Sequence, residues 1–282
     1  MPELPEIESV RRMLEPGLHG RRVEAVDVRR ADVVAHPDAE TFRRLLTGAV
    51  FTTAGRRGKF LVLGLAGAEG PLRLVIHLRM TGCLLLAPAG HPEEKHTHVV
   101  LSLSDSSGGT ELRFSDTRRF GRLWLLEEGE SDALCGIDRL GVEPLSPALT
   151  AEYLSSKFGR SARAIKSCLL DQSVIAGIGN IYSDEILFSA GIHPERAASG
   201  LTAEEWECLA EVIPERLGYF CAKNEMTSEE ALDLRGRDYR NTPFLQVYGH
   251  EGHPCPVCGS ALRRIVVGGR SSVFCPECQS IG

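Results

Sequence analysis

The chain has 282 residues, a formal net charge of −6, 43% hydrophobic residues and 25% charged residues. These proportions match globular proteins and exclude disordered, collagen-like and coiled-coil chains as overall classes. The acidic balance argues against bulk attraction to nucleic acid, although it leaves room for a local basic face. The sequence has no run of 18 apolar residues and no basic and apolar start of the signal-peptide kind, so we expect a cytoplasmic protein that does not enter a membrane.

The first predicted elements are a helix and then several strands. The helix starts at Pro5, because proline suits a first helical turn, and ends at the glycines at 17 and 20. Short aliphatic runs predict strands at 23–28, 60–65, 72–78, 99–103, 112–114 and 123–126. A short helix is expected at 41–46 and a turn at 105–109. Several short strands within about 100 residues indicate a sandwich or a barrel.

The second half of the chain has a different character. A linker rich in Gly, Glu, Ser and Pro is expected at 127–147. Apolar periodicity then predicts helices at 151–158, 161–170, 180–190, 203–221 and 229–234. The least regular stretch, 223–243, is expected to be a loop, and a hairpin follows from about residue 244.

Cysteine spacing predicts a metal site. Nine cysteines without a secretory signal argue against a disulfide framework. Four of them form two C-x-x-C pairs, Cys255 with Cys258 and Cys275 with Cys278, separated by 16 residues. Two such turns supply the tetrahedral four-thiolate shell that zinc prefers, and they leave no open coordination position. We therefore expect one structural Zn²⁺ and no catalytic metal.

Pro2 is the residue that the sequence singles out for covalent chemistry. Excision of Met1 would expose its secondary amine, and a free α-amine is easier to obtain as a neutral nucleophile than a lysine. Its condensation with an aldehyde-level carbon gives a cationic iminium, which is an electron sink for elimination. The neighbouring Glu3 and Glu6 are candidates for a general acid or base, or simply favourable charges in a helix first turn.

Two further patterns concern nucleic acid. The Gly-Ile-Gly-Asn sequence at 177–180 opens a helix, where it serves either as a phosphate-binding N-terminus or as an ordinary interhelix turn. Basic residues cluster at 56–59, at 118–122 around Phe120, and at Arg263, Arg264 and Arg270. An aromatic side chain among arginines is suited to stacking on bases. Together with a zinc hairpin, these clusters favour nucleic-acid binding.

Seven motifs in the same order as in a known family cover nearly the whole chain. They are PELPE at 2–6, RGKF at 57–60, HLRMTG at 77–82, DTRRFG at 116–121, GIGNIY at 177–182, AGIHP at 190–194 and the four-cysteine hairpin. In this combination the chain resembles bacterial formamidopyrimidine-DNA glycosylase, also called 8-oxoguanine-DNA glycosylase. The sister family, endonuclease VIII, usually starts Pro-Glu-Gly-Pro-Glu, so Leu4 and the Arg118-Arg119-Phe120 run favour the first family.

The resemblance implies catalytic roles for four residues. Pro2 is implied to attack C1′ of the damaged nucleotide, and Glu3 to donate a proton. Lys59 is implied to serve the lesion and its phosphate and to donate a proton in β-elimination. Arg270 in the zinc hairpin is implied to act in δ-elimination.

The resemblance also implies contacts with DNA. Glu6 would hold the extruded base, and Met80, Arg118 and Phe120 would fill the space it leaves, with the arginine facing the orphaned cytosine. The implied backbone or lesion contacts are His96, Arg119, Lys166 and Asn180. Such a wedge is what an enzyme that extrudes a base requires.

The chain departs from the family pattern in two places. A basic residue is common where Ala162 stands, and either Arg160 or Arg163 is a candidate substitute. The family loop that caps the extruded base commonly contains Gly-Gly and Thr-Leu, whereas residues 223–230 here have no glycine and three acids. The sequence therefore leaves the preferred lesion open.

Together these observations predict an α+β protein. Its parts would be an N-terminal β-sandwich domain with flanking helices at 1–135, a helix–two-turn–helix domain at 136–240 and a zinc finger at 244–282. We expect a monomeric, nucleoid-associated DNA glycosylase and AP lyase that acts on damaged double-stranded DNA and releases oxidised purines by β,δ-elimination. The alternatives are an enzyme that prefers oxidised pyrimidines and a non-catalytic damaged-DNA-binding protein on the same scaffold.

Overall fold

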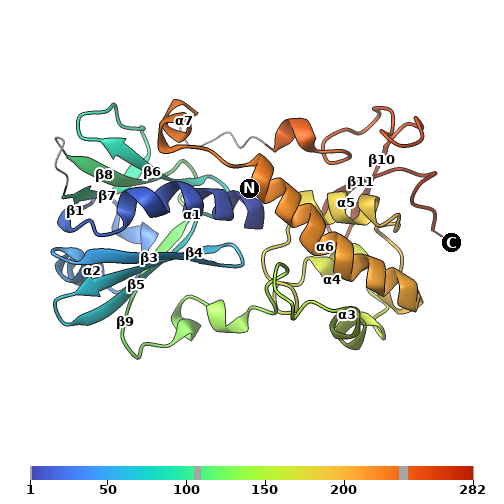
Figure 1. Ribbon diagram of the computed structural model, residues 1–282, viewed down its shortest axis with the longest axis horizontal. Coiled ribbons are helices and arrows are strands. Elements are labelled where there is room, and N and C mark those ends of the chain that lie inside the picture. Colours follow the sequence, from blue (N-terminus) through green and yellow to red (C-terminus); the bar gives the residue numbers. More distant parts are fainter. Residues whose placement is uncertain (1, 105–108, 235–240, 282) are drawn as a thin grey trace. The chain divides into compact units, whose positions relative to one another are not determined.

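A computed structural model describes residues 2–104, 109–234 and 241–281, and it divides them into two compact units (Figure 1). The first unit contains Pro2, the stretch Glu6–Asp138 and the segment that begins at Asn224. The second contains Glu3–Pro5, Arg139–Lys223 and the C-terminal segment. Most of the turn expected at 105–109 lies outside the described residues. No described helix is long and apolar enough to cross a membrane.

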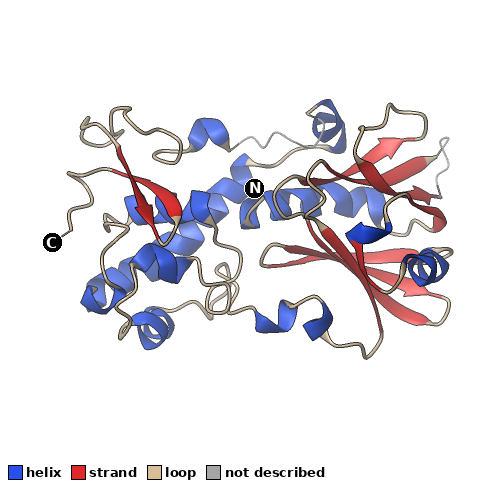
Figure 2. Cartoon of the chain, turned by 180° about the vertical axis from the view of Figure 1, so that it is seen from behind, coloured by secondary structure: helices blue, strands red, loops and turns tan. Residues whose placement is uncertain are grey.

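The first unit is a β-sandwich, as the sequence predicts (Figure 2). One sheet has the order β1-β7-β8-β6, and its strands are β1 (Val23–Val28), β7 (Thr97–Leu103), β8 (Thr110–Asp116) and β6 (Gly82–Pro88). The other has the order β2-β9-β5-β4-β3, with β2 (Val34–His36), β9 (Arg122–Glu127), β5 (Gly70–His77), β4 (Phe60–Gly67) and β3 (Val50–Arg57). All neighbours are antiparallel except β2 and β9.

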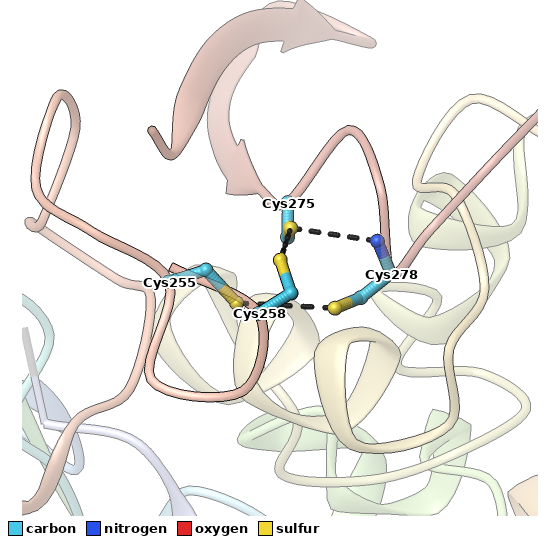
Figure 3. Close-up of side chains that lie close together, drawn as sticks. All are labelled: Cys255, Cys258, Cys275 and Cys278. Carbon is cyan, nitrogen blue, oxygen red and sulfur yellow. Dashed lines mark hydrogen bonds between the residues drawn. The ribbon is translucent and has the colours of Figure 1, made fainter. Parts of the chain in front are cut away.

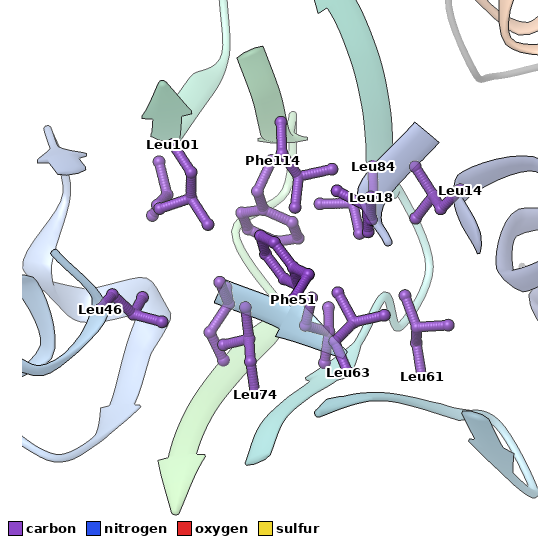
Figure 4. Close-up of a cluster of buried hydrophobic side chains, with 14 of the residues drawn as sticks. Leu14, Leu18, Leu46, Phe51, Leu61, Leu63, Leu74, Leu84, Leu101 and Phe114 are labelled. Atoms are coloured by element: carbon purple, nitrogen blue, oxygen red, sulfur yellow. The ribbon is translucent and has the colours of Figure 1, made fainter. Parts of the chain in front are cut away.

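The core of the first unit lies between the two sheets and α1 (Leu4–Leu18). Figure 4 shows Phe51 and Phe114 packed together, with Leu14 and Leu18 of α1 beside Leu84. All these side chains are essentially inaccessible to solvent. Because apolar burial is the main favourable term in folding, this packing fixes α1 and therefore the N-terminal residues attached to it.

The polar face of α1 is held by an ion-pair cluster around Glu8. Arg11 and Arg12 donate to its carboxylate, and Arg56 of β3 donates from 3.2 Å. Burial opposes the charge, but these hydrogen bonds prevail and lower the pKa of Glu8 from 4.5 to about 2. Since only 9% of the Arg56 side chain is exposed, the basic cluster at 56–59 is in part internal and is not wholly a basic face.

Three strands were not predicted from the sequence: β2, β3 and β6. The β3 strand has polar residues and a glycine, and it is fixed by pairing with β4 from Val50 to Arg57. The β6 strand is buried on both faces, and its run Leu84–Leu86 gives no alternation to recognise. One face of β6 is covered by α7 (Ser228–Asp233), a contact between segments far apart in the sequence.

The helix predicted at 229–234 is present as α7, so the segment after Lys223 is more regular than the loop predicted for 223–243. Thr227 and Glu230 form a reciprocal capping box that starts α7, and Ala231 packs into the sandwich core. The segment from Asn224 therefore belongs with the first unit, whereas the predicted domain 136–240 assigned it to the helical part. The remainder of the predicted loop up to residue 240 lies outside the described residues.

The second unit is helical with one small sheet. Its α-helices are α3 (Ala151–Phe158), α4 (Ile165–Leu169), α5 (Asn180–Ser189) and α6 (Ala203–Lys223). The remaining helix, α2 (Ala39–Leu46), belongs to the first unit. The α4 helix is shorter than the predicted 161–170, because the backbone at its start forms hydrogen bonds outside the helix. The Ile165 N–H donates to the Arg196 carbonyl, and the Arg163 carbonyl accepts from the Ala198 N–H. Strands β10 (Arg263–Val267) and β11 (Arg270–Phe274) form the expected hairpin.

Candidate functional site

Two neighbouring turns of the sandwich bring together the three side chains expected to fill the space of an extruded base. Met80 and Phe120 are 44% and 45% exposed, and exposed apolar side chains that gather in one place are more informative than isolated ones. Arg118 connects them: its Nη1 lies 3.4 Å from the Met80 sulfur, and its guanidinium carbon lies 4.7 Å from the centre of the Phe120 ring. The structure therefore makes one exposed cluster of three residues that are up to 40 positions apart.

Asp116 holds the two turns together by hydrogen bonds to both of them, a role that the sequence did not indicate. Its side chain is 1% exposed, and its carboxylate accepts from the Thr81 hydroxyl, from the Arg118 N–H at 3.1 Å and from the Gly121 N–H at 2.7 Å. A Cβ at Gly121 would lie 2.8 Å from the Phe114 ring, so glycine is needed there. The motif Asp-Thr-Arg-Arg-Phe-Gly thus contains both the exposed cluster and its support.

The turn that carries Lys59 lies near a neutral histidine. Lys59 follows Gly58 between β3 and β4, and His77 ends the neighbouring strand β5 opposite Phe60. Burial, followed by the positive charges of Arg79 and Lys59, lowers the pKa of His77 to about 3. The Arg79 N–H donates to Nδ1 of His77 from 3.0 Å, which leaves the ring proton on Nε2. His77 is therefore a fixed, uncharged N–H donor beside Lys59, and sequence reasoning gave it no role.

At the N-terminus the structure gives Glu3 and Glu6 different surroundings. Glu6 is 2% exposed, and its carboxylate accepts from Nδ2 of Asn224 at 3.2 Å. Pro2 is buried within the same unit as Glu6. Glu3 is 1% exposed, so both carboxylates are too buried to be simple solvated charges of a helix first turn.

Glu3 occupies the N-terminus of α5 and is 1% exposed. The Ile181 and Tyr182 N–H groups donate to its two oxygens from 3.0 and 3.3 Å. A Cβ on Gly179 would lie 2.2 Å from the Glu3 carboxyl carbon, so this glycine makes room for the carboxylate. The 177–180 motif therefore binds an anion at a helix N-terminus, but the anion is a side chain of the protein and not a phosphate.

Lys166 does not lie at a surface in the described structure. It is fully buried, and its Nζ donates to Asp184 Oδ1 at 2.6 Å and to the Ser271 carbonyl at 3.0 Å. Asp184 also accepts from the Ser272 hydroxyl and the Val273 N–H. Burial lowers the pKa of Lys166. The expected contact of this ammonium with DNA does not fit this geometry, in which Lys166 joins α4 and α5 to the zinc hairpin.

The other expected contacts are placed as follows. His96 is half-buried. Arg119 is exposed, has a left-handed φ of 56°, and its Nη1 lies 3.6 Å from Asp32 Oδ2. Asn180 donates to the Ser271 carbonyl from 3.1 Å. Arg163 is exposed and paired with Asp171 at 3.0 Å, and Arg160 is also exposed, so the structure does not choose between them. Arg270 is exposed at the hairpin turn made by two glycines of positive φ.

The four cysteines of the two pairs converge as a zinc site requires. All four sulfurs lie within 4.8 Å of one another, and Figure 3 shows Cys258 facing Cys275 and Cys255 facing Cys278. The Sγ–Sγ separations of these pairs are 3.4 and 3.9 Å. They bracket the roughly 3.8 Å expected between thiolates at 2.3 Å from a tetrahedral Zn²⁺. The donor set and its geometry fit a structural zinc.

Family models match the chain in three successive parts. They describe the N-terminal domain of formamidopyrimidine-DNA glycosylase at residues 1–123, its H2TH domain at 140–229, and a zinc finger found in this enzyme and in isoleucyl-tRNA synthetase at 252–281. The three matched ranges follow one another in the same order as the motifs.

Curated relatives and solved structures extend over the full chain. The formamidopyrimidine-DNA glycosylase of Moorella thermoacetica is 47% identical, and the match covers 94% of each chain. That of Pelotomaculum thermopropionicum is 42% identical over all of both chains. Lactococcus lactis Fpg in complex with DNA containing an oxidized pyrimidine is 33% identical, with a TM-score of 0.87 over 99% of this chain and 100% of that one. A complex of the same enzyme with Fapy-dG-containing DNA has a TM-score of 0.86 at 32% identity and the same coverage. The chain belongs to the formamidopyrimidine-DNA glycosylase family.

Proposed function

We propose that the protein is a bifunctional DNA glycosylase and AP lyase of base excision repair that releases oxidised purines such as 8-oxoguanine and formamidopyrimidines. The observation that carries this proposal is the exposed cluster of Met80, Arg118 and Phe120. A base that is extruded from the duplex leaves a vacancy, and its stacking energy of a few kcal/mol must be replaced. One flexible and one flat apolar side chain supply stacking, and the guanidinium supplies donors for the O2 and N3 acceptors of an unpaired cytosine.

The covalent step is assigned to Pro2. Its amine attacks C1′, the glycosidic bond breaks with release of the base, and opening of the sugar ring gives the iminium. Glu3 handles the protons of this step. Two N–H groups at the α5 N-terminus fix the position of its carboxylate, which we assign to take the proton that the Pro2 nitrogen loses and to pass it to the ring oxygen.

The elimination steps are assigned to Lys59 and Arg270. The iminium acidifies C2′, so that loss of a C2′ proton breaks the C3′–O bond, with Lys59 as proton donor. A second elimination breaks the C5′–O bond, with Arg270 assisting the leaving phosphate. Both side chains are held on short turns between paired strands, which limits their freedom before substrate arrives.

The predicted division into parts at 1–135, 136–240 and 244–282 stays our proposal for the functional modules. We also propose that the protein acts as a monomer on chromosomal DNA in the cytoplasm, at the nucleoid. The relatives that share its fold include an enzyme bound to an oxidized pyrimidine lesion, so activity on oxidised pyrimidines is the second candidate.

Trapping with borohydride tests the proposal. Intact-mass measurement first establishes that Met1 has been removed. Borohydride should then join the protein covalently to DNA that contains 8-oxoguanine opposite cytosine, with the linkage at Pro2. A folded protein whose α-amine has been chemically blocked should give no adduct and no strand cleavage. Full cleavage by the blocked protein would reject Pro2 as the nucleophile, and tight lesion binding without any cleavage by the unblocked protein would favour a non-catalytic binding protein.

A further inference from the structure

Arg270, to which the second elimination is assigned, begins β11 directly after the hairpin turn. The turn is formed by Gly268 and Gly269, whose φ angles are 55° and 78°. A Cβ on Gly268 would lie 2.8 Å from the hydroxyl oxygen of Ser167, so the turn approaches α4 closely. The Arg270 side chain is exposed and has many rotamers to choose from. The place of its backbone therefore decides which positions the guanidinium can reach.

Asp184 of α5 binds the backbone and a side chain just beyond Arg270. The β11 strand pairs only with β10 among the described strands, so its other edge offers backbone groups for further bonds. The Val273 N–H donates to Asp184 Oδ2 from 3.0 Å, and the Ser272 hydroxyl donates to Oδ1 from 2.6 Å. Because only 1% of Asp184 is exposed, water does not compete for these hydrogen bonds.

Lys166 and Asn180 bind the residue between these contacts and Arg270. The Nζ of Lys166 donates to Asp184 Oδ1 from 2.6 Å and to the Ser271 carbonyl from 3.0 Å. Asn180, at the start of α5, donates to the same carbonyl from 3.1 Å. Each of the three residues that follow Arg270 is therefore bound to side chains of α4 or α5.

We propose that Asp184 is a positioning residue for Arg270, because it fixes the start of β11 and so sets where the guanidinium meets the leaving phosphate. This inference rests on the proposed function. In the second elimination a C4′ proton passes to water, its bonding pair forms the C4′–C5′ double bond, and the C5′–O pair leaves on the phosphate. The phosphate thereby gains negative charge, which a guanidinium stabilises best from a fixed place.

The first elimination provides an internal reference for this role. It is assigned to Lys59, which lies in the first unit, whereas Asp184 and the hairpin lie in the second. A displaced start of β11 should therefore slow the second elimination and spare the first. A general loss of folding or of DNA binding would slow both steps together.

The test follows both eliminations on one duplex that contains an abasic site opposite cytosine. Single-turnover time courses on gels separate the unsaturated aldehyde end left by the first elimination from the 3′-phosphate end left by the second. Asp184→Asn removes the charge and one acceptor, and Ser272→Ala removes a single hydrogen bond and decides the matter if Asp184→Asn does not fold. Glu211→Gln, which removes an exposed carboxylate of α6, is the control, and Arg270→Ala shows the rate without the guanidinium. Thermal melting and zinc content verify that each variant is folded.

Asp184→Asn should slow the second elimination at least about tenfold, since a misplacement of about 1 Å can cost a hundredfold. Ser272→Ala should slow it by about threefold to tenfold, the effect of one hydrogen bond. The first elimination should stay within about twofold of wild type in both variants, and the control should match wild type in both steps.

Three results would overturn the role of Asp184. They are an unchanged second elimination in folded Asp184→Asn (or in Ser272→Ala where Asp184→Asn does not fold), equal losses in both steps, and a second elimination that persists in Arg270→Ala. Absence of strand cleavage by the wild type would instead overturn the proposed function.

Discussion

The buried pair of Lys166 and Asp184 offers a strong test of how the second unit is held together. Both side chains are at most 1% exposed, and 2.6 Å separates Nζ from Oδ1. Removal of one partner of a buried ion pair costs about 3–5 kcal/mol, because the other is left without its counter-charge. In Lys166→Met, Asp184 keeps the donors Ser272 and Val273. We therefore expect the lower end of that range, about 3 kcal/mol.

The double variant Lys166→Met, Asp184→Leu should be less destabilised than the sum of its two single variants. It removes both charges together, and the resulting coupling energy should be at least about 2 kcal/mol. Urea unfolding of the zinc-loaded protein measures these free energies, with the exposed Lys157→Met as control. The reasoning would be refuted if Lys166→Met lowered the free energy of unfolding by less than about 1 kcal/mol and also weakened DNA binding. That result would indicate that Lys166 contacts DNA.

Four further outcomes are expected. Cys258→Ser should lose zinc in elemental analysis and lose DNA affinity, and wild-type protein purified without zinc would contradict the metal assignment. Gly179→Ala should displace Glu3, because the new Cβ would lie 2.2 Å from its carboxyl carbon, and should lower borohydride trapping at least about tenfold. Arg118→Ala should weaken single-turnover action on a lesion opposite cytosine by about 1–3 kcal/mol and less opposite adenine, whereas an equal loss for all four opposite bases would indicate a phosphate contact. The depressed pKa of Glu8, about 2 against 4.5, contributes stability that is complete above pH 4.5 and lost as the pH falls toward 2; Glu8→Gln should flatten this acid dependence of urea unfolding.

The sequence by itself determined the composition of the site and the class of the fold. Pro2 and the C-x-x-C pairs were recognisable because their chemistry depends on residue type and on spacing along the chain. The sandwich strands β4, β5 and β7 were recognisable because each buries an aliphatic run. Such local signals survive without knowledge of the fold, and so the zinc ligands and the order of the elements could be predicted.

Only the tertiary structure decided which polar groups meet. Asp116 and His77 lie in motifs that the sequence singled out, yet the sequence gave them no role, because an aspartate or a histidine acquires its role from neighbours that are distant along the chain. The reverse holds for Lys166, for which the family resemblance implied a contact near the lesion, yet Asp184 and the Ser271 carbonyl enclose it. Burial of a charge requires a partner to offset its desolvation, and the partner is chosen by packing. The sequence therefore determined what the functional groups are, and the packing of α1, α5 and α7 determined what each of them faces.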